Sequence, residues 1–330
     1  MQNNQNSSNL KREYYMPLDA YKVFFWSTLG TIIASFLMVF ILTGVAMANN
    51  ISYAELVSKR GILILLSLVS PIVFSSLYFL YNKKNNIKQF SSLGLKNKFK
   101  PINILYCLLV SLVCLFFLEP FINILNFGFG KLGYNPSFLV YETDTIGRLF
   151  VSILISAVLP AIFEELLFRG IILNGLTKKF DPKTSIILSA LLFMLMHGSL
   201  EQTFYQFALG LVFGCIAYYS GSVIYSIITH FFNNAIVLTL NYFVSALLEG
   251  RSQYNIVDLS IAILYLSLAV LIIYLLIKCI SFENDKKEDN FKNENYTYNP
   301  SSEVRAKEKV VFYVGLGLSI ILWLLNTLAG

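Results

Sequence analysis

The sequence predicts an all-α fold, a polytopic bundle of about eight or nine membrane-spanning helices. Of the 330 residues, 56% are hydrophobic and only 13% are charged, about half the charged fraction of a typical soluble domain. The apolar residues are concentrated in runs close to the roughly 20 residues that a helix needs to cross a bilayer. The lipid bilayer is therefore an expected partner. The net charge of +6 is modest and does not indicate a nucleic-acid-binding surface.

Nine apolar segments are candidate helices. The fourth contains Pro160, which would interrupt its helix, and the fifth is short for a span. Glu119–Pro120, near the end of the third, is interpreted as a kink near an interface. The segments cover residues 21–47, 61–81, 102–127, 146–176, 184–197, 202–219, 222–248, 257–280 and 310–328. The chain is thus expected to comprise a polar N-terminus (1–20), N-terminal transmembrane helices (21–128), a second group of helices (145–248), one further helix (257–280), a charged linker (281–309) and a last helix (310–328).

Lysines gather in the loops of one side. Because cytoplasmic loops carry an excess of Lys and Arg, the loop after the second segment and the turn after the fourth should be cytoplasmic. Segments 1–20 and 281–309 are then cytoplasmic as well. We expect a multi-pass protein of the cell membrane. If the fifth segment does not span, the sidedness of everything after it inverts. The lysines are Lys83, Lys84, Lys88, Lys96, Lys98 and Lys100 in the loop and Lys178, Lys179 and Lys183 in the turn, whereas Lys59, Arg60, Lys131 and Arg251 are exceptions on the other side.

Ionisable residues inside apolar segments are costly, roughly 2.5–3.5 kcal/mol on insertion scales, and usually mark function. The fourth segment carries Glu164, Glu165 and Arg169. Glu165 and Arg169 are four residues apart and share one helix face, so a structural ion pair is available to them. Glu164 is rotated by about 100° from Glu165, has no cation at helical spacing on its own side, and is the better candidate for chemistry.

The only two histidines of the chain, His197 and His230, also lie in apolar segments. His197 ends the fifth segment, four residues after Phe193, and a histidine at a helix end is often a capping residue. His230 and Asn234 are one turn apart in the seventh segment, where a plain interhelical hydrogen bond is also possible.

Together a carboxylate, two imidazoles and an amide are the parts of a hydrolytic centre. A glutamate desolvated in the membrane can act as general base near neutral pH, and imidazole and amide groups can bind a developing oxyanion. Alternatively, Glu164, His197 and His230 could hold zinc, whose bound water would be the nucleophile. No HExxH motif is present to favour a metal.

Three motifs resemble those of a known family. They are Glu164-Glu165-x-x-x-Arg169, Phe193-x-x-x-His197 and His230-x-x-x-Asn234, similar to the EExxxR, FxxxH and HxxxN motifs of the CAAX-protease and bacteriocin-processing family of intramembrane proteases. The segment 207–214 resembles the glycine-bearing helix of that family, and 91–95 resembles a stretch of its bacterial members. The strong resemblance covers about residues 145–245, so 145–248 is expected to be the catalytic core.

The resemblance implies a helical bundle with a cavity open to the cytoplasm. It implies that Glu164 activates water with the help of His197, that His230 and Asn234 stabilise the oxyanion, and that Glu165, Arg169 and Phe193 support the site. The family has been described both as zinc-dependent and as metal-free. For this chain we expect no cofactor, with zinc as the alternative.

Three functions remain open from the sequence. We favour an intramembrane endopeptidase over a non-catalytic bacteriocin-immunity or scaffold protein of the same fold, and both over a transporter, because no internal repeat is present. An Asn-rich and Lys-rich chain is typical of bacteria, where prenylated CAAX proteins are not expected. A peptide, leader or membrane-protein substrate is therefore predicted, and no nucleic acid.

Overall fold

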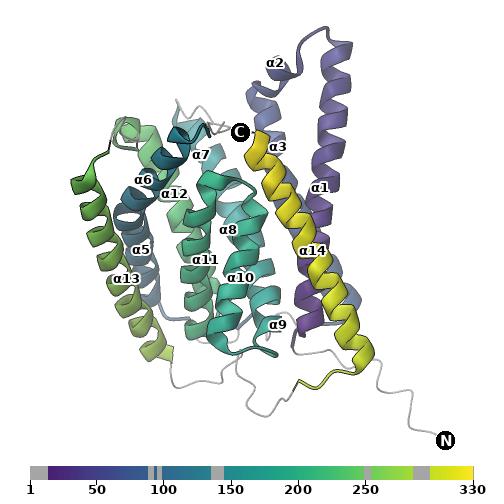
Figure 1. The fold of residues 1–330 in the computed structure, drawn as a ribbon, viewed down its shortest axis with the longest axis vertical. Helices are drawn as coiled ribbons and strands as arrows, with labels where there is room; N and C mark the ends of the chain where they lie inside the picture. The colour runs from purple at the N-terminus through teal and green to yellow at the C-terminus, as the bar shows by residue number, and fades with distance from the viewer. Residues whose placement is uncertain are drawn as a thin grey trace, which may run out of the picture.

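The part of the chain that the structure describes is a bundle of helices, seven of which are long and apolar enough to cross a membrane. The computed structural model describes residues 14–87, 93–94, 99–134, 145–248, 254–284 and 298–329, without the side chains of 244–248, 281–284 and 329. Across these residues the elements are helical throughout. The expected all-α polytopic bundle is confirmed (Figure 1).

The nine expected segments all lie in helical structure. The elements in chain order are α1 (Pro17–Ala48), α2 (Tyr53–Val57), α3 (Arg60–Asn85), α5 (Ile102–Val113), the π-helical turn η2 (Cys114–Leu118), α6 (Glu119–Lys131), α7 (Ile146–Ile153), the π-helical turn η3 (Leu154–Val158), α8 (Leu159–Glu165), the π-helical stretch η4 (Leu166–Leu173), α9 (Asn174–Leu176), α10 (Pro182–His197), α11 (Leu200–Ser220), α12 (Val223–Leu248), α13 (Ile256–Asn284) and α14 (Ser302–Ala329). Among them the short α2 was not expected from the sequence.

The fifth and sixth expected segments, α10 and α11, are not among the seven long apolar helices. α10 has only 16 residues, and α11 carries Glu201, Gln202 and Thr203 in its first turn. The two helices pack side by side as a hairpin. The chain therefore leaves one end of the bundle with α10 and returns to the same end with α11 (Figure 1). The helices after this hairpin thus keep the sidedness that the lysines predict.

Local signals define the ends of α10. The Asp181 side chain caps its N-terminus by accepting a hydrogen bond from the Thr184 backbone N–H at 3.1 Å, and Pro182 occupies the first turn, where its missing N–H costs nothing. Hydrogen bonds from the Thr184 side chain and backbone lower the pKa of the Asp181 carboxyl. At the other end Gly198 adopts φ +65°, a left-handed conformation that ends helices.

Two glycines of α11 let it approach α10 closely. A Cβ on Gly210 would lie 3.0 Å from both Cα and Cβ of Ala190, and one on Gly214 would lie 3.1 Å from the Ile186 side chain. Small residues at helix contacts let backbones come together in membranes, where packing is the main cohesive term. This close contact brings the backbone carbonyl of Gly210 against η4.

Several contacts gather the basic segments at one end of the bundle, which we call the basic end. Lys179 pairs with Glu308 of α14 at 2.9 Å, and the Lys100 backbone N–H donates to the Tyr225 hydroxyl at 2.7 Å. The Val223 N–H donates to the Leu93 carbonyl at 3.1 Å. This end comprises the starts of α1, α5, α10, α12 and α14 (Figure 1). Lys88, Lys96 and Lys98 of the predicted basic loop lie outside the described residues.

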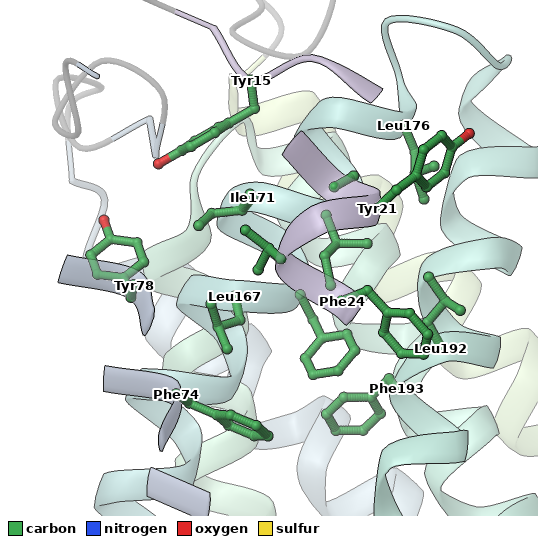
Figure 2. Close-up of a cluster of buried hydrophobic side chains, with 14 of the residues drawn as sticks. Tyr15, Tyr21, Phe24, Phe74, Tyr78, Leu167, Ile171, Leu176, Leu192 and Phe193 are labelled. Atoms are coloured by element: carbon green, nitrogen blue, oxygen red, sulfur yellow. The ribbon is translucent and has the colours of Figure 1, made fainter. Parts of the chain in front are cut away.

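The largest cluster of buried apolar side chains joins α1, α3, η4, α9 and α10 (Figure 2). Figure 2 shows it running from Tyr15 and Leu176 at one side to Phe193 at the other. Phe24, Leu167 and Ile171 lie between them and are fully buried. This cluster fixes the fourth spanning segment, which carries both glutamates, against the first.

Replacing Gly210 by Ala should destabilise the protein. Since the added Cβ would meet the backbone of Ala190 at 3.0 Å, one helix must move, and overpacking of this kind costs about 1–3 kcal/mol. Thermal unfolding of the purified protein in detergent should show a lower Tm. Gly317→Ala is the matched control, because Gly317 is also helical and has nothing within 4 Å of an added Cβ. Equal stability of the two variants would contradict this account of the hairpin.

Candidate active site

The fourth spanning segment changes its helical form around the glutamates. Pro160 lies in the first turn of α8, directly after η3, so the expected interruption is a π-helical turn and not a break. Glu164 and Glu165 end α8, and Arg169 lies in η4. π-helical segments of this kind occur mostly at functional sites.

Glu165 and Arg169 form the ion pair that their spacing predicts. Arg169 Nη1 donates to Glu165 Oε1 at 2.7 Å, and both side chains are 0% exposed. Arg169 Nη2 donates to the Gly210 carbonyl at 3.0 Å, which is the partner supplied by the close α10–α11 contact. The Arg169 guanidinium also lies over the Phe193 ring, with Cζ 4.5 Å from its centroid. A buried charge needs ionic and hydrogen-bond partners of this kind; among the described residues Nε alone has none.

His230 completes this buried group. Its Nδ1 lies 3.1 Å from Glu165 Oε1, the same oxygen that accepts from Arg169. Because a carboxylate accepts hydrogen bonds, Nδ1 carries a proton and Nε2 points away from Glu165. The Phe213 ring stacks on the imidazole with centroids 4.8 Å apart. The orientation of His230 is therefore set by a carboxylate and an aromatic ring.

Glu164 lies between the two histidines. Its Oε2 is 3.9 Å from His197 Nε2 and 4.0 Å from His230 Nε2. Within the described chain this oxygen is buried and has no hydrogen-bond partner. The side chains of Glu164 and His197 are 14% and 20% exposed, whereas Glu165 and Arg169 are fully enclosed. Both glutamates have a buried Oε2 without a hydrogen-bond partner among the described residues. Glu165 is tied to Arg169 and His230 through its Oε1, whereas Glu164 Oε2 lies between two imidazoles.

A backbone carbonyl sets the tautomer of His197. His197 Nδ1 lies 2.9 Å from the Phe193 carbonyl, and since a carbonyl only accepts, Nδ1 carries the proton. In the neutral ring Nε2 is then an acceptor, and it faces Glu164. The Phe193 ring also contacts the imidazole, with centroids 4.6 Å apart. The spacing of the FxxxH motif thus serves both contacts, because residues four apart on a helix are neighbours.

Asn234 lies one turn from His230 and is tied to the fourth segment. Its Nδ2 donates to the Ser156 carbonyl in η3 at 3.1 Å. Asn233 Nδ2 is 3.4 Å from Asn234 Oδ1, and Asn233 Oδ1 accepts from the Tyr205 hydroxyl at 3.1 Å. One of the two hydrogens on Asn234 Nδ2 is therefore used, and the other is free to donate.

The structure brings six of the seven predicted residues into one network of direct contacts: Glu164, Glu165, Arg169, Phe193, His197 and His230. Asn234 adjoins it through α12. The sequence did not indicate Phe213, the Gly210 carbonyl or Tyr205 as site residues. Phe213 and Gly210 lie in the glycine-bearing segment 207–214, so the sequence did place them near the site. That the backbone carbonyl of Gly210 binds Arg169 could not be seen from the sequence.

The zinc alternative can be compared with this geometry. Donors sharing a tetrahedral zinc at 2.0–2.2 Å lie about 3.4 Å apart, and the separations from Glu164 to the two Nε2 atoms are 3.9 and 4.0 Å. Across the described ranges no group of three His, Cys, Asp or Glu side chains is arranged to hold a metal ion. The separations from Glu164 to the two imidazoles thus exceed the zinc-ligand spacing by about 0.5 Å.

Residues 146–236 match a family model described as Rce1-like, type II CAAX prenyl endopeptidase Rce1-like. The matched segment runs from α7 into α12 and contains all seven predicted site residues. It supports the assignment to the CAAX-protease and bacteriocin-processing family that the three motifs indicated. No curated protein and no solved structure matches the chain significantly.

Removing one partner of the buried ion pair should destabilise the protein far more than removing both. Arg169→Leu leaves the Glu165 carboxylate buried without its cation, which costs about 3–5 kcal/mol. Adding Glu165→Gln should recover part of that loss, so a double-mutant cycle on thermal unfolding in detergent should show strong coupling.

The pair between Lys307 and Glu303 is a matched control for this cycle. It has the same four-residue spacing at 2.5 Å, but its side chains are 62% and 76% exposed. Exposed helical pairs contribute about 0.3–0.5 kcal/mol, so Lys307→Leu should leave the Tm nearly unchanged. An equal decrease in Tm on breaking either pair would contradict the assignment of Glu165 and Arg169 as a structural pair.

Proposed function

We propose that the chain is an intramembrane endopeptidase that hydrolyses a peptide bond with a glutamate-activated water. The observation that carries the proposal is the position of Glu164 Oε2, which has no hydrogen-bond partner among the described residues and faces the Nε2 atoms of His197 and His230 at 3.9 and 4.0 Å. The match of residues 146–236 to the Rce1-like family supports the same class of reaction.

A water molecule fits between Glu164 and His197. Two acceptors 3.9 Å apart can share one water at about 2.8 Å from each, with an angle near 90° at its oxygen. Both of its hydrogens are then held, and a lone pair is directed toward a substrate carbonyl. Glu164 takes a proton as the water oxygen bonds to the carbonyl carbon, and it gives that proton to the departing amine nitrogen as the C–N bond breaks.

His230 and Asn234 are proposed to bind the oxyanion of the tetrahedral intermediate. Asn234 has one N–H hydrogen left after its bond to Ser156. His230 uses Nδ1 toward Glu165, so it can donate from Nε2 only when both nitrogens are protonated. Donors fixed before the reaction stabilise developing charge most effectively, and here Glu165, Phe213 and Ser156 hold them.

The proposed substrate is a peptide or a membrane-associated protein, in keeping with a site enclosed by spanning helices. We place the protein in a bacterial cell membrane with its N-terminus in the cytoplasm, on the distribution of its lysines. The bilayer is a further partner, and no nucleic acid is proposed.

Glu164→Gln should abolish cleavage while leaving the fold intact. The amide cannot accept the proton of the attacking water, and loss of a general base costs about 10²–10⁴-fold in rate. Comparison of membrane peptides from cells with the wild-type and variant proteins should reveal products that are absent from the variant. Glu303→Gln, which alters an exposed glutamate of α14, is the control and should cleave normally. An active, purified Glu164→Gln protein would show that the base lies elsewhere.

The same variant separates the enzyme from a non-catalytic immunity or scaffold protein. Such a protein would need the fold but not the base. If Glu164→Gln supports the cellular phenotype fully while its Tm is unchanged, the scaffold function is correct and the peptidase is not.

A zinc chelator should leave the activity of the purified enzyme unchanged, because the proposed mechanism uses Glu164 and His197 without a metal. Cleavage would be measured before and after 1,10-phenanthroline treatment, with the non-chelating 1,7 isomer as control. Loss of activity that added zinc restores would favour the alternative in which Glu164, His197 and His230 bind the metal.

A further inference from the structure

Between the site and the basic end the protein is filled with packed side chains. After Glu165 the chain continues through η4 and α9 toward that end, and residues 167–176 are all buried. Leu167, Ile171 and Leu176 are 0% exposed. Figure 2 shows these side chains packed with Tyr15, Phe24 and Phe193. Phe193 itself touches both catalytic histidines.

Helices α12 and α5 are also packed between the site and the basic end. On α12 the turns that precede His230 contain Val223, Ser226 and Thr229, each 0% exposed. The Thr229 carbonyl accepts from the Ser111 hydroxyl of α5 at 2.9 Å, which ties the two helices together. Interiors packed in this way hold few voids as large as a water molecule. The route from the basic end to Glu164 along η4 and α12 is therefore closed by packed side chains.

Toward the opposite end, which we call the far end, the surroundings change. His197 is the last residue of α10, so the α10–α11 turn borders the site directly. With 16 residues, α10 is about 24 Å long, less than the roughly 30 Å of a hydrocarbon core. The turn therefore ends inside the thickness of the bilayer, below the far-end surface.

Polar side chains continue from the site in that direction. Asn233 and Asn234 follow His230 along α12, and the Tyr205 hydroxyl of α11 reaches Asn233. Glu201, one turn closer to the α10–α11 turn, is 6% exposed and its side chain hydrogen-bonds Tyr134, while its Oε2 has no partner among the described residues. Polar groups at membrane depth are retained where they face a protein interior or water. This arrangement favours hydration on the far side of the site.

We propose that water and substrate reach Glu164 from the far end, which faces away from the cytoplasm. The lysines place the basic end in the cytoplasm, so the substrate enters the site from the non-cytoplasmic side of the bilayer. The substrate class is then an exported peptide or the outer end of a membrane-anchored segment. This rests on the proposed peptidase function, and it differs from the cytoplasmic opening that the family resemblance implies.

Cysteine labelling tests the direction of access without using activity. Cys107, Cys114, Cys215 and Cys279 would be replaced by Ala, and this background would be retained if it still cleaves. Single cysteines would then replace His197 in the site, Asn326 of α14, whose side chain lies 2.8 Å from an added Cβ on Gly198, and Lys183 at the basic end. Each would be treated with a charged, membrane-impermeant maleimide in intact spheroplasts and in inverted vesicles.

We expect His197→Cys and Asn326→Cys to react at least tenfold faster in spheroplasts, and Lys183→Cys at least tenfold faster in inverted vesicles. Faster labelling of His197→Cys from the face that labels Lys183→Cys would overturn the proposal, as would labelling of Lys183→Cys from outside. A His197→Cys protein that reacts from neither face, while its unfolded form reacts fully, would also overturn it. Failure of the peptidase function would instead appear as an active Glu164→Gln enzyme, whatever the labelling.

Discussion

The site depends on one buried charge, the Arg169 guanidinium. It neutralises Glu165, and through Glu165 it fixes the ring of His230. An unpaired guanidinium inside a membrane protein would be prohibitive, so the fold must supply partners for it. It does so with a carboxylate one turn away, a carbonyl from α11 and the faces of Phe193 and Phe213. The catalytic geometry follows from satisfying this charge.

Helix packing provides one partner of Arg169, the backbone carbonyl of Gly210. The Gly210 carbonyl reaches Arg169 only because a residue without Cβ allows α11 to lie against Ala190 of α10. The same hairpin ends at His197, whose Nδ1 is held by the Phe193 carbonyl. Stability of the hairpin and orientation of His197 are therefore coupled, and a change at one contact alters both.

Two adjacent glutamates perform opposite tasks because a helix directs them to different neighbours. Glu165 is enclosed and paired, whereas Glu164 Oε2 lies between two imidazoles. The site is also asymmetric along the bundle axis. Packed apolar side chains separate it from the basic end, and polar side chains extend from it toward the far end. Chemistry and access are thus decided by different parts of the same helices.

The sequence by itself determined the helices and the chemical groups. Long apolar runs leave few alternatives to spanning helices, since every backbone group must be satisfied within lipid, and rare ionisable residues in those runs identified Glu164, Arg169 and His230. Local spacing also predicted the pair of Glu165 with Arg169. Only the tertiary structure decided that Glu164 lies between the two histidines while Glu165 bonds to His230, that Gly210 and Phe213 complete the site, and on which side the site is closed. Those features depend on contacts between helices far apart in the chain, and spacing along one helix carries no information about them.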